Sequence, residues 1–167
     1  DDLRINNRFF KGGNSFRGFD VAGIGPRDVY TDYDLDGNVT KVTRVNSQSS
    51  LGGKAYGIGT VELTVPNFLP SEYGIKTSLF TEFGTVGLLD DEDKTPEQSI
   101  DLTDINGNVV GTRVLNTEDE ASLRASAGVS IFWDSPFGPI RFDFSQILNK
   151  EDYDRTETFR FSTSTQF

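Results

Sequence analysis

A period of two in the segment 121–134 constrains the fold more than any other feature of the sequence. Its odd positions carry small and apolar residues, from Ala121 to Trp133, whereas its even positions, from Ser122 to Asp134, are mostly polar or glycine. Such alternation is typical of a β-strand with one apolar face, and a strand in a soluble protein usually has only about 4–8 residues. A tilted strand needs about 9–11 residues to cross a bilayer. Length and alternation together favour a membrane-crossing strand.

Four further segments alternate in the same way, the first two more weakly: 54–65, 75–86, 140–145 and 159–167. The connections after the first four strands are in turn short, long, short and medium: 66–74, 88–120, 135–138 and 148–156. Short periplasmic turns and longer external loops are typical of outer-membrane barrels.

The polar faces of these strands carry Arg141 and Arg160, which would be costly to bury in a dry core without partners but not in a watery lumen. About five strands cannot close a barrel, since the smallest barrels have eight. We therefore predict an all-β fold, part of an antiparallel transmembrane β-barrel that is incomplete on its own. The start at 1–4 does not resemble a signal peptide, and we expect a fragment rather than a wall completed by another chain.

Two parts are expected along the chain. Residues 1–53 lack sustained alternation and are predicted to form a long extracellular loop, with a hairpin turn at 36–38. Residues 54–167 hold the barrel strands and an acidic extracellular loop at 88–120. Ten acidic and two basic residues fall within 90–120, so we interpret that stretch as a long solvated loop, with a second candidate hairpin turn at 106–108.

The composition excludes several classes of function. With no histidine and no cysteine, the chain has no Ser-His triad, no thiol nucleophile and no zinc site with nitrogen or sulfur ligands. An enzyme on a barrel is therefore disfavoured. The net charge of -10 argues against nucleic acid as a partner, because phosphates require a basic surface.

Several motifs resemble the BamA family of outer-membrane assembly factors, in the same order along the chain. They are RFFKGG at 8–13, FRGF at 16–19, GPR at 25–27, GG at 52–53, FGTV at 83–86 and SPFGPIRF at 135–142. The resemblance covers about residues 8–167, with Phe16 standing where the family usually has a small aliphatic residue. It implies the C-terminal part of the barrel, with the loop 1–53 folding back into the lumen.

The resemblance also implies a set of site residues. Arg17, Gly18 and Phe19 would form the inserted loop tip, and Glu62 and Glu82 an acidic pair that holds it, with Glu82 where Asp is common. A guanidinium binds carboxylates in a two-pronged geometry that lysine cannot reproduce. The alternative is an ordinary solvated arginine and two unrelated lumenal acids.

The last strand carries Phe159, Phe161 and Phe167 on one face. The resemblance implies a terminal recognition signal and a weakly paired seam that opens sideways. The simpler alternative is an interfacial aromatic anchor, and the run 162–165, poor in bulky residues, fits a weak seam and a strand end among the headgroups equally well.

A weak metal candidate lies at Asp32, Asp34 and Asp36, which match the first positions of a calcium-binding loop. Position twelve of that loop is Thr43, where a bidentate glutamate is required. The alternative is a hairpin with an acidic, solvated turn.

The resemblance implies a non-enzymatic insertase that folds and inserts β-barrel proteins into the bacterial outer membrane through a lateral seam. Its implied partners are unfolded barrel clients, accessory BAM lipoproteins and the lipid and lipopolysaccharide bilayer, with no cofactor. A TamA-type assembly factor or a two-partner secretion transporter shares the Arg-Gly-aromatic loop and stays open. A passive porin explains the alternation but not the order of the motifs.

Overall fold

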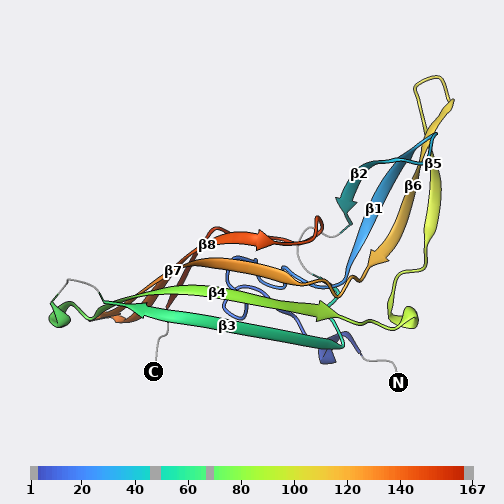
Figure 1. Ribbon diagram of the computed structural model, residues 1–167. Coiled ribbons are helices and arrows are strands. Elements are labelled where there is room, and N and C mark those ends of the chain that lie inside the picture. The colour runs from blue at the N-terminus through green and yellow to red at the C-terminus, as the bar shows by residue number, and fades with distance from the viewer. Residues whose placement is uncertain (1–3, 46–49, 67–69, 164–167) are drawn as a thin grey trace.

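The computed structural model describes residues 4–45, 50–66 and 70–163 (Figure 1). Within these ranges the chain forms two antiparallel sheets and three short 3-10 turns, η1 (Ile5–Asn7), η2 (Ser71–Tyr73) and η3 (Asp91–Asp93). In this part of the chain there is no helix with the length and apolar character needed to cross a membrane.

The larger sheet has five strands in the order β3-β4-β7-β8-β9 and does not close (Figure 1). Its strands are β3 (Ala55–Val65), β4 (Ile75–Gly87), β7 (Arg124–Ser135), β8 (Gly138–Asn149) and β9 (Phe159–Thr163). All neighbours are antiparallel, and each strand overlaps a segment predicted from alternation. The prediction of an all-β, antiparallel, incomplete barrel is confirmed. Phe167 lies outside the described residues.

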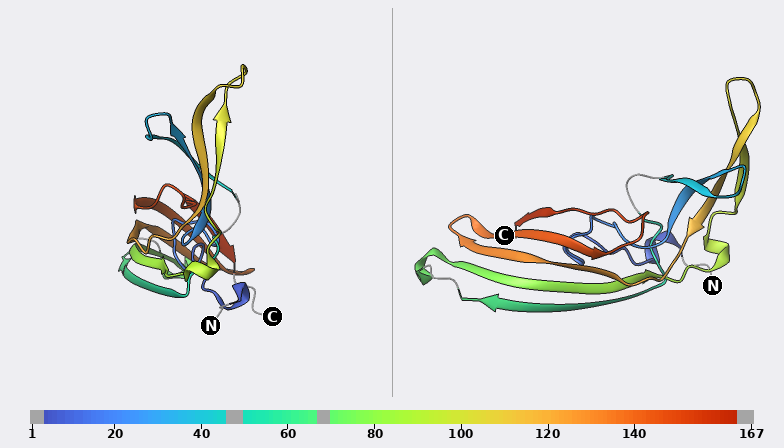
Figure 2. Two further views of the ribbon diagram at one scale, coloured as in Figure 1. Left: turned by 90° about the vertical axis from the view of Figure 1, so that its right-hand side faces the viewer. Right: turned by 45° about the horizontal axis from the view of Figure 1, so that its top comes forward.

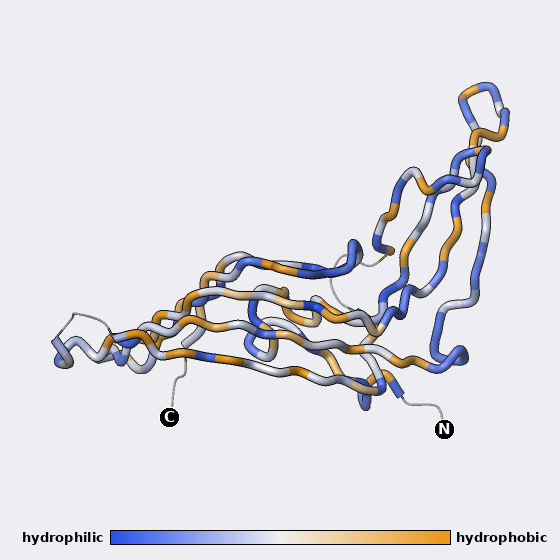
Figure 3. The backbone as a smooth tube through the Cα atoms, in the orientation of Figure 1, coloured by the Kyte–Doolittle hydropathy of each residue, from blue (hydrophilic) through white to orange (hydrophobic). Residues whose placement is uncertain are grey.

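Alternation places polar side chains on one face of this sheet and apolar ones on the other, which is visible as alternating colours along the strands in Figure 3. On β4 and β7 the even-numbered residues Glu82, Ser126 and Ser130 are buried on the concave face. The odd-numbered residues Leu79 and Trp133 are exposed on the opposite face. The apolar face is therefore the one available to lipid.

The N-terminal loop lies within the curve of this sheet, where Figure 2 shows it enclosed by the strands. Its apolar residues Phe16, Phe19 and Ile24 are fully buried and pack with Val86 of β4. The rings of Phe16 and Phe19 meet edge to face, with centroids 4.8 Å apart. The one apolar core of the described residues thus lies between the loop and the polar face of the sheet.

A second sheet of four strands stands away from the first (Figures 1 and 2). Its order is β2 (Val39–Arg44), β1 (Arg27–Asp34), β6 (Val109–Glu118) and β5 (Gln98–Thr103). The acidic stretch 88–120 is thus not a long solvated loop throughout, since it contains a hairpin that pairs with the N-terminal segment. β1 and β6 pair in continuous register from Arg27 opposite Glu118 to Asp34 opposite Gly111.

The paired hairpin lies within a stretch whose residues are mostly exposed or half-buried. The acidic residues cluster at the two ends of the stretch, whereas β5 carries one charged residue, Asp101, and β6 carries two, Arg113 and Glu118. A high acidic content predicts that side chains remain solvated, but it does not prevent the backbone from pairing. The extracellular position of this sheet stays a prediction.

Both predicted hairpin turns are confirmed, and they share one construction. Asp34 accepts hydrogen bonds from the backbone N–H groups of Asp36 and Asn38, at 3.0 and 2.8 Å. Asp104 does the same for residues 106 and 108 of the second hairpin, at 2.8 and 2.9 Å. Gly37 and Gly107 supply the positive φ that each turn requires, +82° and +83°.

The two hairpins are also joined by a two-pronged ion pair. Arg113 of β6 donates to both carboxylate oxygens of Asp32 on β1, with Nε and Nη2 at 2.6 and 2.8 Å. These hydrogen bonds lower the pKa of Asp32 below its ordinary value. A group whose pKa is depressed by folding contributes stability that is present above its unfolded pKa and is lost as the pH falls through the folded value.

We therefore expect the β1–β6 pairing to weaken below about pH 4, the unfolded pKa range of aspartate. Asp32→Asn should loosen the pairing at pH 7 and remove this part of its pH dependence. Amide exchange of β1 and β6 between pH 7 and pH 3, corrected for the intrinsic rate, measures both effects. Asp101→Asn on the exposed strand β5 is the matched control, and an equal response in the two variants would contradict the assignment.

Candidate functional site

The loop tip is a tight turn that brings Arg17 against the wall of the sheet. The N–H of Gly13 donates to the carbonyl of Phe19 at 2.7 Å and closes the base of the turn. Gly18 has a φ of +90°, and a Cβ at that position would lie 2.9 Å from Ile147 Cδ1 and 3.0 Å from Ser126 Cβ. Only glycine suits both the backbone conformation and the close approach.

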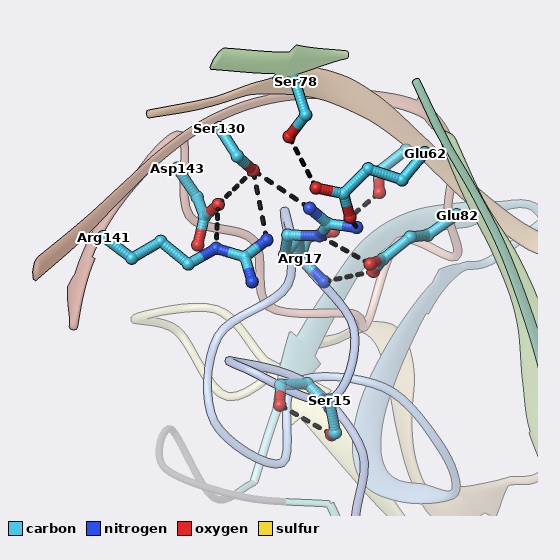
Figure 4. A network of polar contacts seen from close by, with 10 residues as sticks. Ser15, Arg17, Glu62, Ser78, Glu82, Ser130, Arg141 and Asp143 are labelled. Atoms are coloured by element: carbon cyan, nitrogen blue, oxygen red, sulfur yellow. Dashed lines mark hydrogen bonds and ion pairs between the residues drawn. The ribbon is translucent and has the colours of Figure 1, made fainter. Parts of the chain in front are cut away.

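Arg17 reaches three strands of the wall at once (Figure 4). Its Nε donates to Glu82 Oε1 at 2.6 Å and its Nη2 to Glu62 Oε2 at 3.0 Å. Nη1 donates to Ser130 Oγ at 2.9 Å. The guanidinium also lies over the ring of Phe80, with Cζ 3.7 Å from the centroid, and the side chain is only 5% exposed.

The backbone of the tip is held as well as the side chain. The N–H of Arg17 donates to Glu82 Oε2 at 2.6 Å, so that Glu82 binds both the main chain and the guanidinium. On the other side, the hydroxyl of Ser126 donates to the carbonyl of Arg17 at 2.6 Å. The tip is therefore fixed in orientation as well as in depth.

A second guanidinium lies beside the first. Arg141 Nη2 donates to Ser130 Oγ at 3.1 Å, and its Nε donates to Asp143 Oδ1 at 2.8 Å. The Ser130 hydroxyl in turn contacts Asp143 (Figure 4). Ser130 thus joins the Arg17 contacts on β3 and β4 to a charged pair on β8, and the two cations lie near three carboxylates.

The structure therefore brings Arg17, Glu62 and Glu82 together, with Gly18 and Phe19 beside them, as the sequence led us to expect. That these contacts hold the loop in a functional position stays a prediction. Sequence analysis did not select Ser130 or Asp143. Both lie on the polar faces of alternating strands, but a serine among other serines gives no signal of which one meets an arginine 113 residues away.

The aromatic residues of the last strand lie apart from this site. Phe159 and Phe161 are half-exposed on the outer face and contact Phe142 and Phe144 of β8, with centroids 5.1–6.4 Å apart. Within the described residues, β9 pairs with β8 from Phe144 opposite Phe159 to Ile140 opposite Thr163. This arrangement fits an outward anchor and a seam strand equally.

The geometry does not support the calcium candidate. Asp32 is engaged by Arg113, and Asp34 caps the hairpin turn that contains Asp36. Within the part of the chain that the structure describes, no three acidic residues are grouped so as to hold a metal ion. These aspartates build the β1–β2 hairpin instead.

The GPR motif has a structural function at the base of the loop. Arg27 is buried, and its Nη2 donates to the carbonyls of Ala22 and Gly23, at 3.2 Å each. Burial, followed by the nearby charge of Arg44, lowers the pKa of Arg27 to about 10. Arg27 therefore remains a cation at neutral pH, and its hydrogen bonds hold the backbone of residues 22–23, directly after the tip.

The model of the Omp85 superfamily domain matches residues 1–167, the whole chain. The chain belongs to the Omp85 superfamily. It is thus an outer-membrane protein whose strands form part of a β-barrel. The polar concave face, the inserted loop and the open five-stranded sheet are the corresponding barrel features in this chain.

Three relatives illustrate the similarity. The outer membrane protein assembly factor BamA of Neorickettsia risticii is 34% identical over 163 residues, which are 98% of this chain and 17% of that protein. The factor of the same name from Neisseria meningitidis serogroup B is 28% identical over 179 residues, 99% of this chain and 19% of that protein. The chain thus spans less than a fifth of these curated relatives.

The crystal structure of BamA from Haemophilus ducreyi lacking POTRA domains 1–3 is similar in fold, with a TM-score of 0.60 and 27% identity. The match covers 94% of this chain and 26% of that one.

The contacts of Arg17 predict strong coupling in a double-mutant cycle. Arg17→Glu or Glu82→Arg alone should destabilise the protein by about 3–5 kcal/mol, because each leaves like charges buried together. The double exchange should recover part of that loss, with a coupling energy of about 0.5–3 kcal/mol. Urea unfolding of the complete barrel in lipid measures the cycle.

Arg17→Glu combined with Asp101→Asn on the distant strand β5 is the control, and it should be additive within about 0.5 kcal/mol. Additivity of the Arg17 and Glu82 changes as well would show that the contact does not hold the loop.

Proposed function

We propose that this chain is the C-terminal barrel part of a factor that folds β-barrel proteins and inserts them into the bacterial outer membrane. The relatives named as outer membrane protein assembly factors, which align with almost the entire chain, support this proposal. The factor acts without a covalent step. Its chemistry is backbone pairing, and it needs neither a nucleophile nor a cofactor.

The observation that carries the proposal is the position of β9 at the edge of the open five-stranded sheet. Among the described residues, β9 pairs on one side with β8, from Phe159 to Thr163. The other edge of β9 has no strand beside it in the described part of the chain. Each unpaired backbone group in lipid costs several kcal/mol, so this edge must be paired with the first strand of the barrel or with an incoming client.

A client strand would compete for that edge by β-augmentation, in which an extended segment adds to a sheet through main-chain hydrogen bonds. The aromatic face of β9, with Phe159 and Phe161, would guide the apolar side of the client toward lipid. Accessory lipoproteins of the assembly complex and the lipopolysaccharide bilayer are the further partners proposed.

The tip serves this function by filling the lumen and by holding β3, β4 and β7 in their relative positions. Arg17 joins β3, β4 and β7 across the concave face, away from the seam. The Arg17 contacts therefore hold β3, β4 and β7 without themselves binding β9. Glu62, Glu82 and Arg17 act here as a clamp on the loop.

A TamA-type assembly factor or a two-partner secretion transporter remains the second candidate, since the same Arg-Gly-aromatic tip would serve it. A passive porin fits less well. A porin requires a water-filled lumen, whereas here the inserted loop packs on the concave face and buries Phe16, Phe19 and Arg17 completely or nearly so.

A disulfide between β9 and the first strand of the complete barrel tests the proposal. The locked protein should fail to assemble clients, because the edge is no longer available, and reduction should restore assembly. The yield of folded client in proteoliposomes is the measurement. A cysteine pair of the same kind between β3 and β4 is the control and should leave assembly unchanged. Normal assembly by a fully locked seam would reject lateral opening.

A further inference from the structure

The segment 150–158, which connects β8 to β9, is built around a buried ion pair. Arg124, the first residue of β7, donates through Nε to Asp154 Oδ2 at 2.9 Å and through Nη2 to Asp154 Oδ1 at 3.3 Å. Both side chains are 0% exposed. An ion pair so completely removed from water is tolerated only where every donor of the guanidinium has a partner.

Every donor of Arg124 does have one. Nη2 also reaches the hydroxyl of Tyr153 at 3.3 Å, and Nη1 donates to the carbonyls of Glu120 and Ser122 at 2.8 and 3.0 Å. Burial raises the pKa of Tyr153 to about 12, so its hydroxyl stays neutral at physiological pH. The five N–H groups of the guanidinium therefore hold two segments, 120–122 and 153–154, in one geometry.

On its opposite side, the same segment forms backbone–backbone hydrogen bonds with the loop tip. Asp20 N–H donates to the carbonyl of Arg155 at 3.0 Å, and Arg155 N–H donates to the carbonyl of Gly23 at 2.9 Å. Glu157 N–H donates to the carbonyl of Gly18 at 3.0 Å, next to Arg17. An ion pair between Arg155 and Asp20 adds to these contacts.

The segment 150–158 thus lies between two sets of contacts. On one side is the cage, which we define as Arg124 with its partners in 120–122 and 153–154, and on the other side is the tip. The segment continues directly into β9 at Phe159, two residues after the contact of Glu157 with Gly18. Its last residue, Thr158, accepts a hydrogen bond from Ser145 N–H of β8 at 2.8 Å. A shift of this segment would move the tip and the beginning of the seam strand together.

We propose that Arg124 and Asp154 are positioning residues that fix the segment 150–158 as a bracket and thereby couple the docking of the Arg17 tip to the pairing of β9. The bracket deepens the seam function proposed above and rests on it for its biological consequence. The physical coupling itself depends only on the contacts of this chain. A docked tip holds the start of β9 in register, and release of the bracket loosens both.

Two variants test separately the two sides of the bracket, namely the Arg124 contacts and the backbone contact with the tip. Arg124→Lys keeps the charge but cannot reproduce the five-donor geometry, so it loosens the cage. Glu157→Pro leaves the Arg124 contacts intact and removes the N–H that binds Gly18. Glu157→Gln keeps that N–H and, like Glu157→Pro, removes the ion pair with Arg160, so it is the control. Lys150→Gln, on the exposed side of the same segment, is the control for Arg124→Lys.

Hydrogen exchange measured by mass spectrometry on the full-length protein in nanodiscs gives the readout. Arg124→Lys should raise exchange of both the tip (13–24) and β9 by at least about tenfold, with β3 and β4 unchanged. Glu157→Pro should raise exchange in the same two segments, whereas both controls should match the wild type. Faster exchange confined to 150–158, or to only one of the two segments, would overturn the coupling.

A rescue distinguishes positioning from general loss of structure. This chain has no cysteine, so Asp20→Cys and Arg155→Cys can replace their ion pair with a disulfide. In the Arg124→Lys background the oxidised form should restore protection of the tip, and the reduced form should not. If protection does not return on oxidation, or if Arg124→Lys exposes all strands alike, the bracket is not what positions the tip.

Client assembly is scored separately on the same variants. If exchange rises at the tip and at β9 but client assembly is undiminished, the coupling proposal stands and the proposed seam function is rejected. Unchanged exchange at both segments would reject the bracket whatever happens to assembly.

Discussion

A cation inserted into a polar wall is the interaction on which the rest of this structure depends. Arg17 is nearly buried, and a buried charge is tolerated only with partners. Here two carboxylates, a serine hydroxyl and an aromatic face supply them from three different strands. Because Glu82 also binds the backbone N–H of Arg17, the tip cannot rotate without losing both contacts. The concave face must remain polar to accept it, and this requires the period-two pattern along every strand.

The inserted loop is held at three separate places. The wall binds Arg17, the segment 150–158 binds the backbone of residues 18–23, and β1 pairs with β6 in the second sheet. Each contact joins segments far apart in the chain, so the loop position is a property of the whole assembly of strands. Loss of one contact should loosen the loop without releasing it, which is useful in a protein whose seam is proposed to open.

The two antiparallel sheets differ in which of their faces and edges are exposed. In the five-stranded sheet, one face is apolar and available to lipid and the other is polar and covered by the loop. In the four-stranded sheet, the outer strands β2 and β5 are largely exposed, and turns capped by Asp34 and Asp104 end the hairpins. Lys41 and Arg44 on β2 and Asp101 on β5 are charged residues on these edges, and such charges oppose edge-to-edge association.

The sequence by itself determined the strands of the barrel sheet, their two faces and both hairpin turns, because alternation and Asp-x-x-Gly-Asn turns are local signals. The resemblance of its motifs to a known family added the meeting of Arg17 with Glu62 and Glu82. Only the tertiary structure decided that the acidic hairpin pairs with β1, that Ser130 receives two guanidinium groups, and that Arg124 meets Asp154. Apart from the contact of Arg141 with Ser130, these contacts join residues 30 to 113 positions apart, and many serines and acids of equal local character could have filled each place. The curvature of the sheet selects among them, and no periodicity along the chain encodes that choice.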